Sequence, residues 1–233
     1  MRPRRRRGST FVAGQPVVLR PVFSLAVPPL FALFSVPHLV PLLIRGINNL
    51  SDARYCAGMG ADKLTFVLDP AIPGYIDIKA VKELSGWIAG VELIGEFDQL
   101  SAAEINAIAA DCALDAVLLR QPRSAAELAE IAPPVYLELA VGALATASYL
   151  PAAPVGIVVE LTIPLTSEVR EGLSELAAQR PLWIGPGLDP ALAQELITSL
   201  SPAGLAFPSG DEVKPGLRDF DQLEAVFEAL EVD

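Results

Sequence analysis

Histidine is almost absent from this sequence, and cysteine is scarce. The 233 residues contain one histidine, His38, and two cysteines, Cys56 and Cys112. Neither cysteine has the spacing of a metal-ligand set, and a catalytic triad of the serine-hydrolase type needs a histidine in the folded body of the chain. Two cysteines in a chain of otherwise cytosolic composition also argue against a disulfide framework. The sequence therefore predicts neither a metal site nor a histidine-based triad.

Acidic residues are missing from the first forty positions. Six arginines give this segment a charge of +6, so the formal net charge of −11 for the whole chain leaves −17 for residues 41–233. Affinity for phosphate backbones comes mainly from Lys and Arg, so we expect no binding of nucleic acid. The sequence also lacks a dinucleotide-binding fingerprint and a P-loop motif, and we expect no cofactor.

Residues 1–40 combine a basic start with an apolar body. Prolines at positions 21, 28, 29, 37 and 41 interrupt the apolar part. Proline inside a helix removes a backbone hydrogen bond, so we expect no stable membrane span. The segment is interpreted as a disordered extension or a start codon assigned too early, with targeting, membrane association or a folded cap as alternatives. We expect the protein to be cytoplasmic.

The rest of the chain alternates short apolar runs with amphipathic stretches. The eight runs cover residues 42–46, 61–68, 87–95, 114–120, 135–141, 155–161, 181–188 and 204–210. They are rich in Val, Ile and Leu and bounded by Gly, Pro, Asp or Ser, which is typical of buried parallel strands. Stretches such as 51–60, 101–112, 166–179, 189–200 and 219–230 carry apolar residues at helical spacing. The alternation predicts a single (βα)8 TIM-type barrel over residues 41–233.

Charged residues interrupt several of the apolar runs. They are Arg45, Glu92, Arg120, Glu138 and Glu160. Alternate residues of a barrel strand point inward, so some of these side chains must face the lumen or its mouth. Charge in such a place is costly unless it is paired, and we expect Arg45 to pair with Glu160. Trp87 and Trp183 open two of the runs, and we expect both to be packing residues.

Four segments, in order, resemble the phosphoribosylanthranilate isomerase family. LLIRGINNLSDARYCAGMGADKLTFVL resembles the family's opening K-I-C-G-I, followed by a D-A helix and G-A-D. DPAIPGYID resembles its Y-P-x-S-P-R-Y-V loop, and WIGPGL resembles L-A-G-G-L. PSGDEVKPGLRDFDQLEAVF resembles S-S-G-V-E-x-x-P-G-x-K-D, with residues 209, 210, 212, 215, 216 and 219 matching. Together the four segments extend over about residues 42–230.

The resemblance implies an Amadori rearrangement in tryptophan biosynthesis, in which an aminoaldose phosphate becomes an aminoketose. In the family, an aspartate at the end of strand 6 protonates the ring oxygen, and the cysteine of K-I-C-G removes the proton on C2. The arginine of the S-P-R-Y loop helps to bind the substrate, and backbone N–H groups of the two glycine loops hold its phosphate. The resemblance thus implies a phosphosugar-like ligand at Gly74, Gly187, Ser209 and Gly210, and leaves the oligomeric state open.

This chain departs from the family pattern at each of these positions. Arg45 stands in place of the cysteine, Glu160 in place of the aspartate and Gly74 in place of the arginine. Pro186 and Pro208 replace the first residues of G-G and S-S-G, and each proline removes one backbone N–H. Asp211 adds a carboxylate beside the second of these loops. A guanidinium stays protonated and cannot act as a base, so Arg45 cannot do the work of the cysteine.

The substitutions leave two hypotheses of function. The first is an isomerase of impaired activity, in which Glu160 remains as an acid. The second is a non-catalytic or repurposed barrel that binds a different small ligand or a protein partner. For the charged residues themselves, three interpretations stay open: a structural ion pair that fills a vestigial pocket, a reshaped polar site, and the original chemistry with Glu160 and another base. Cys56 and Cys112 are interpreted as buried core residues.

Overall fold

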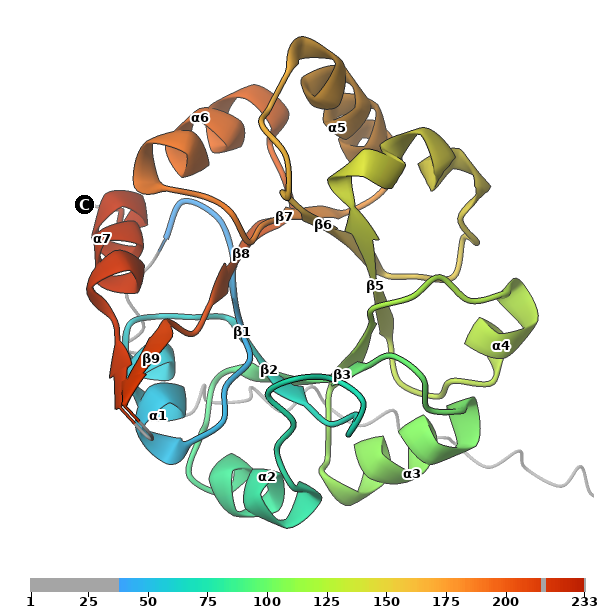
Figure 1. Ribbon diagram of the computed structural model, residues 1–233, viewed down its shortest axis with the longest axis vertical. Coiled ribbons are helices and arrows are strands. Elements are labelled where there is room, and N and C mark those ends of the chain that lie inside the picture. The colour runs from blue at the N-terminus through green and yellow to red at the C-terminus, as the bar shows by residue number, and fades with distance from the viewer. Residues whose placement is uncertain (1–37, 215–216, 233) are drawn as a thin grey trace, which may run out of the picture.

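Eight parallel strands close into a barrel in chain order, in which each strand pairs with the next and β8 pairs with β1 (Figure 1). The strands are β1 Leu42–Arg45, β2 Lys63–Val67, β3 Glu92–Phe97, β4 Ala116–Leu119, β5 Val135–Ala140, β6 Gly156–Glu160, β7 Leu182–Ile184 and β8 Gly204–Pro208. This computed structural model describes residues 38–214 and 217–232. It describes only the backbone of residues 146, 148, 149, 211–214 and 217–218. The chain is therefore a (βα)8 TIM-type barrel, as its alternating pattern predicts.

Helices surround the barrel and pack on the outer faces of the strands (Figure 1). They are α1 Leu50–Gly58, α2 Ile78–Ser85, α3 Ala102–Asp111, α4 Ala125–Ala129, α5 Ser167–Gln179, α6 Pro190–Leu200 and α7 Asp221–Leu230. After β8, a small antiparallel hairpin, β9 Asp211–Lys214 with β10 Leu217–Asp219, precedes α7. None of the described helices is both long and apolar enough to cross a membrane.

The side chains of the strands separate into two cores. The outward residues pack against the helices in the larger core, which includes Leu42, Ile44, Phe66 and Leu205. The inward residues fill the barrel itself, and they are Leu43, Ile94, Ala116, Leu118, Val158, Trp183 and Ala206. Because both faces are buried, the strands are apolar nearly throughout. The exceptions are inward residues at the ends of the strands, and these form the candidate site.

The connection between β5 and β6 departs from the expected alternation. It forms a 3₁₀ helix, η2 Val141–Tyr149, where the repeat predicts an α-helix. No side chain caps its first turn, since Ala140 stands at the N-cap position, whereas Ser101 makes a full capping box with Glu104 at the start of α3. Without a cap, the first N–H groups of a helix lack partners, which disfavours a regular α-helix in this segment.

The two tryptophans have opposite environments. Trp183 lies inside the barrel with 5% of its surface exposed, and its ring meets that of Tyr136 edge-on with centroids 6.1 Å apart. Trp87 lies five residues before β3 begins and is 71% exposed. The expectation that Trp87 is a packing residue is therefore wrong, because the third strand starts only at Glu92 and the preceding residues belong to the turn after α2.

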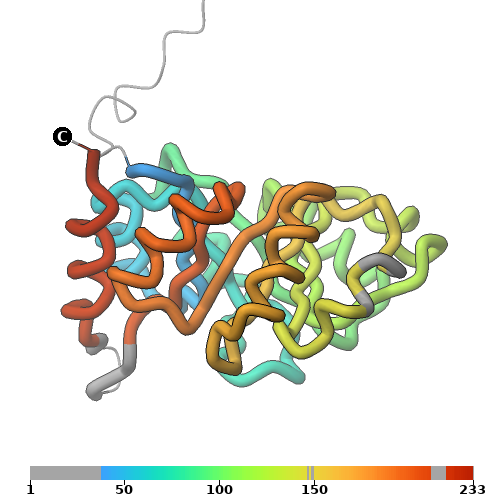
Figure 2. The backbone as a smooth tube through the Cα atoms, turned by 90° about the horizontal axis from the view of Figure 1, so that it is seen from above, coloured from blue at the N-terminus to red at the C-terminus, as the bar shows by residue number. Residues whose placement is uncertain are grey.

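The described chain begins beside its own C-terminal helix (Figure 2). His38 forms an isolated antiparallel bridge with Glu231, and the amide of Leu39 donates to the carbonyl of Leu230 at 2.9 Å. The His38 ring also lies 5.3 Å from that of Phe227. Residues 1–37, where we expect an extension, lie outside the described residues.

Candidate functional site

A cavity of about 580 Å³ opens at the carboxyl ends of the barrel strands. In TIM barrels this end of the sheet carries the active site. Of the site residues that the sequence predicts, four line this cavity: Arg45, Gly74, Glu160 and Ser209. The other two, Gly187 and Gly210, line a neighbouring cavity of about 180 Å³ that shares Pro208 with the first. All six therefore lie at one end of one barrel.

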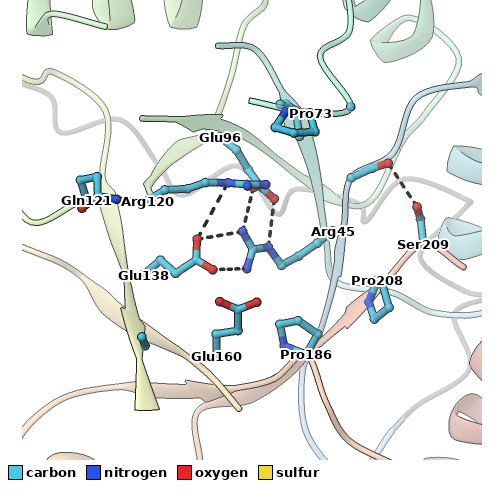
Figure 3. Close-up of a pocket in the computed structure, with 14 residues that line it drawn as sticks. Arg45, Pro73, Glu96, Arg120, Gln121, Glu138, Glu160, Pro186, Pro208 and Ser209 are labelled. Carbon is cyan, nitrogen blue, oxygen red and sulfur yellow. Dashed lines mark hydrogen bonds and ion pairs between the residues drawn. The ribbon is translucent and has the colours of Figure 1, made fainter. Parts of the chain in front are cut away.

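Arg45 is clamped between two carboxylates (Figure 3). Its Nε and Nη2 donate to Oε1 and Oε2 of Glu96 at 3.0 and 2.7 Å. Its Nη1 and Nη2 donate to Oε1 and Oε2 of Glu138 at 2.8 and 3.1 Å. Two bidentate contacts are the strongest arrangement that a guanidinium can make with carboxylates. Burial alone would lower the pKa of Arg45, but the two carboxylates outweigh it and raise the pKa above its ordinary value.

Glu96 is the centre of this arrangement and is completely buried. Besides Arg45, it accepts hydrogen bonds from Nε and Nη2 of Arg120 at 2.9 and 2.6 Å and from the hydroxyl of Thr65 at 2.5 Å. Burial opposes ionisation, yet these partners, Arg45 first among them, lower the pKa of Glu96 to about 2. We call Arg45, Glu96, Arg120 and Glu138 the mouth cluster, and its two positive and two negative groups balance.

The expected pair of Arg45 with Glu160 is wrong, because Arg45 binds Glu96 and Glu138 instead. Arg45, Glu96 and Glu138 come from β1, β3 and β5, and Thr65 of β2 and Arg120, directly after β4, also bind Glu96. Glu160 ends β6 and takes no part in these contacts. Glu96 lines the cavity but is absent from the residues that the sequence predicts, since the third apolar run ends at residue 95 whereas β3 continues to Phe97.

Glu92 lies at the opposite end of the barrel from the mouth cluster. It stands at the first position of β3 and forms an ion pair with Lys63, at the first position of β2. The ammonium of Lys63 also lies 5.7 Å from the ring centroid of Tyr136 and 5.5 Å from that of Trp183. This group closes the floor of the barrel and takes no part in the mouth cavity.

Glu160 points into the mouth cavity beside Glu138 and Pro186 (Figure 3). Within the described part of the chain, its carboxylate makes no hydrogen bond and no ion pair, in contrast to the other charged residues of the cavity wall. It is partly buried. Glu160 is therefore the one charged group of the described cavity wall that lacks a partner.

Three residues of the loops after β7 and β8 have no free donor for an anion. Pro186 and Pro208 have no N–H. The N–H of Ser209 donates to the carbonyl of Arg45 at 2.9 Å, and its hydroxyl donates to the carbonyl of Gly46 at 3.1 Å. The side chain of Asp211, which the sequence places beside this loop, lies outside the described residues.

Backbone geometry explains why glycine occupies two positions in these loops, without reference to a ligand. Gly187 has φ +103°, and a Cβ there would lie 2.6 Å from the carbonyl oxygen of Leu161. Gly210 has φ +93°, and its Cβ would lie 2.4 Å from the carbonyl oxygen of Asp219. Backbone conformation and close approach thus require glycine at both positions, so their presence alone is no evidence for phosphate binding.

Gly74 also has a positive φ, +87°, but nothing lies within 4 Å of the place where its Cβ would be. The cavity wall is therefore open where the family resemblance puts an arginine. The two cysteines lie away from this cavity. Cys56 is fully buried in α1 and Cys112 is 1% exposed at the end of α3, and neither lines the mouth cavity.

Comparison with known proteins gives a consistent set of relatives. No protein-family model matches the chain. An N-(5'-phosphoribosyl)anthranilate isomerase of Trichormus variabilis is 26% identical over 207 residues, covering 80% of this chain and 96% of that protein. One from Synechococcus sp. is 27% identical over 209 residues, covering 80% of this chain and 88% of that protein.

Solved structures of the same enzyme share the fold. Phosphoribosyl anthranilate isomerase from Thermus thermophilus superposes with a TM-score of 0.69 at 22% identity, covering 82% of this chain and 98% of that one. The enzyme from Thermotoga maritima gives a TM-score of 0.66 at 24% identity, with the same 82% and 98% coverage. The likeness therefore extends over the whole barrel.

Proposed function

We propose that this chain, which belongs to the phosphoribosylanthranilate isomerase family as a divergent member, keeps the family's barrel but has lost most of its capacity for the Amadori rearrangement of tryptophan biosynthesis. The observation behind the proposal is the double clamp of Arg45 on Glu96 and Glu138. The family's base belongs at this position, and a guanidinium held by two carboxylates cannot accept the proton on C2 of the substrate.

The nearby carboxylates are poor replacements for that base. Glu96 has a pKa of about 2 and no exposed surface, so it neither reaches a substrate nor holds a proton near neutral pH. Glu138 is 11% exposed, and both of its oxygens accept hydrogen bonds from Arg45. These hydrogen bonds hold both oxygens of Glu138 against the guanidinium of Arg45. Glu160 can still act as an acid, but an acid alone does not complete the rearrangement.

Binding of the substrate is weakened as well. The two prolines remove backbone donors from the loops after β7 and β8, and both donors of Ser209 are used within the protein. Gly74 supplies no cation at the place of the family's arginine. These departures lie at the same cavity as Arg45, which supports loss of the reaction over drift at a single position.

Restoration of the base tests the proposal. Arg45→Cys alone would leave two buried carboxylates without their main partner, so it is combined with Glu96→Gln and Glu138→Gln. A second variant adds the family residues at the remaining positions: Glu160→Asp, Gly74→Arg, Pro186→Gly and Pro208→Ser. We expect no turnover of phosphoribosylanthranilate by the wild-type protein, and measurable turnover by the second variant, since a positioned base contributes about 10²–10⁴-fold.

The matched control carries serine in place of cysteine at position 45 in the same background. Serine has the size of cysteine but supplies no thiolate, so this control should remain inactive. Equal activity of the Cys and Ser variants would show that the missing base is not what limits the reaction. Efficient turnover by the wild-type protein would refute the proposal outright.

A second candidate function is a repurposed barrel that binds a small molecule. The specific observation in its favour is that the mouth cavity persists at about 580 Å³, a volume typical of small-molecule sites, although the mouth cluster fills its floor. The identity of residue 45 separates the two candidates, because the family reaction needs a base there and a binding protein does not.

A further inference from the structure

We propose that the mouth cavity binds a small, unphosphorylated polyhydroxy molecule that carries a primary ammonium group, with the ammonium at Glu160. The inference rests on the proposed function, since it assumes that the cavity no longer serves the isomerase substrate. It names a class of ligand opposite in charge to a sugar phosphate. Three properties of the described cavity wall carry it: the unpartnered charge of Glu160, the absence of backbone N–H groups at Pro186 and Pro208, and the polar side chains of the wall.

The charge of the cavity is set by one residue. The positive charges of Arg45 and Arg120 are matched by Glu96 and Glu138, through direct hydrogen bonds and ion pairs. Four of the five N–H donors of Arg45 are used in these contacts. Glu160 is left over, and within the described chain nothing neutralises it. The formal charge presented to a ligand is therefore negative.

The position of Glu160 favours a cation further. Its carboxylate lies beside that of Glu138 in the cavity (Figure 3). Each oxygen of Glu138 accepts one hydrogen bond from Arg45, and a carboxylate oxygen can accept two. An ammonium has three donors that can be divided between neighbouring acceptors. A group bound at Glu160 can thus also reach acceptor sites on Glu138 that Arg45 leaves unused.

A phosphate group would be disfavoured at this end of the barrel. Pro186 lies next to Glu160 and offers no N–H, and Pro208, at the end of the neighbouring strand β8, offers none either (Figure 3). Both donors of Ser209 are used within the protein. A dianion near Pro186 would have the carboxylate of Glu160 as its neighbour, and like charges at close range repel.

The remaining wall suits hydroxyl groups. Gln121 lines the cavity and is exposed, so its amide can both donate and accept. Arg120 is 33% exposed and contacts Glu96 through Nε and Nη2, and its Nη1 makes no hydrogen bond to the described residues. A cavity of about 580 Å³ has room for a six-carbon polyol. The amide of Gln121 and the unused Nη1 of Arg120 can bind hydroxyl groups, and the carboxylate of Glu160 can bind an ammonium, which together fit an amino polyol.

Three probes that differ at one group each test the proposal. D-Glucamine has an ammonium at C1, D-sorbitol has a hydroxyl there, and sorbitol 6-phosphate adds a phosphate. Binding to the full-length protein is measured by isothermal titration and by the shift of the thermal midpoint. We expect glucamine to bind at least about tenfold more tightly than sorbitol, the value of a charge-assisted hydrogen bond, and sorbitol 6-phosphate to bind more weakly than sorbitol.

The variant Glu160→Gln should bind glucamine and sorbitol equally, because it keeps the shape of the side chain and removes its charge. Glu171→Gln makes the same change of charge on the exposed face of α5 and should keep the preference for glucamine. The comparison of probes on the wild-type protein does not depend on folding of a variant. It therefore remains decisive if Glu160→Gln is unstable.

Equal binding of glucamine and sorbitol by the wild-type protein would overturn the inference, as would the absence of binding by all three probes. Tighter binding of sorbitol 6-phosphate would overturn it and favour a phosphosugar site. A preference for glucamine that survives Glu160→Gln would show that the ammonium binds elsewhere. A failure of the proposed function would be detected by a different measurement, namely turnover of phosphoribosylanthranilate by the wild-type protein.

Discussion

Replacement of Arg45 by methionine should strongly destabilise the protein. Methionine has a similar length and no charge, so the change removes four hydrogen bonds without leaving a large void. Glu96 would keep Arg120 and Thr65, but Glu138 would keep only a contact of 3.9 Å with Arg120. Breaking a buried ion pair by removing one partner costs about 3–5 kcal/mol, and we expect a loss in this range.

The triple variant Arg45→Met with Glu96→Gln and Glu138→Gln separates charge from packing. Neutral residues of similar volume in place of a buried ion cluster are often neutral or stabilising. The triple variant should therefore regain most of the stability that Arg45→Met loses. The two results together would show that the cluster is stable only while its positive and negative charges match. Replacing one member alone would then lower the free energy of unfolding more than replacing several members together.

Urea unfolding followed by tryptophan fluorescence measures both effects. Trp183 lies inside the barrel and reports on its opening, whereas Trp87 is exposed in the folded state and changes little. The free energy of unfolding is obtained by linear extrapolation, with the slope as a check that the unfolded state is unchanged. A loss below about 1 kcal/mol for Arg45→Met, which is the range of a surface ion pair, would refute the reasoning.

Two further predictions follow from the buried carboxylate and from the loop glycines. The pKa of Glu96 is lowered from 4.5 to about 2 in the folded protein, so its contribution to stability is present above pH 4.5 and is lost as the pH falls towards 2. Acid titration of the free energy of unfolding should thus show a fall about 3 kcal/mol larger for the wild-type protein than for Glu96→Gln, and parallel curves would contradict the assignment. Gly187→Ala should lower the free energy of unfolding by about 1–3 kcal/mol because of the positive φ of Gly187 and the nearby carbonyl of Leu161. Gly142→Ala is the control in the same urea assay. It should have little effect, since the space around its Cβ is open.

The fold could be predicted from the sequence because the strands are apolar on both faces. A strand such as β4 or β6 is buried by the barrel interior on one side and by helices on the other, so its residues form a continuous apolar run. Such a run can be recognised from the local sequence alone. The rule that active sites lie at the carboxyl ends of parallel strands then placed Arg45 and Glu160 at one end of the barrel. Both line the cavity found there.

The partners within the site could not be predicted in the same way. Which charges meet depends on the stagger of the barrel, which brings Arg45 of β1 into contact with Glu96 of β3 and Glu138 of β5. A sequence read strand by strand contains no measure of that stagger. Glu96 could have been found, since inward residues alternate and Ile94 faces the barrel interior. Extending the third strand by two residues beyond Gly95 would have placed Glu96 at the mouth.

The most direct test of the central claim, that the charged cluster at the mouth has replaced the family's base, is a rate measured with the wild-type protein in excess over phosphoribosylanthranilate. With protein in excess, most of the substrate can be bound even when binding is weak. A slow reaction is then detected because each protein molecule needs to convert the substrate only once. We expect the aminoketose product to form no faster than in buffer alone. Product formation well above the buffer rate, lost on Glu138→Gln, would contradict the account and identify Glu138 as the base.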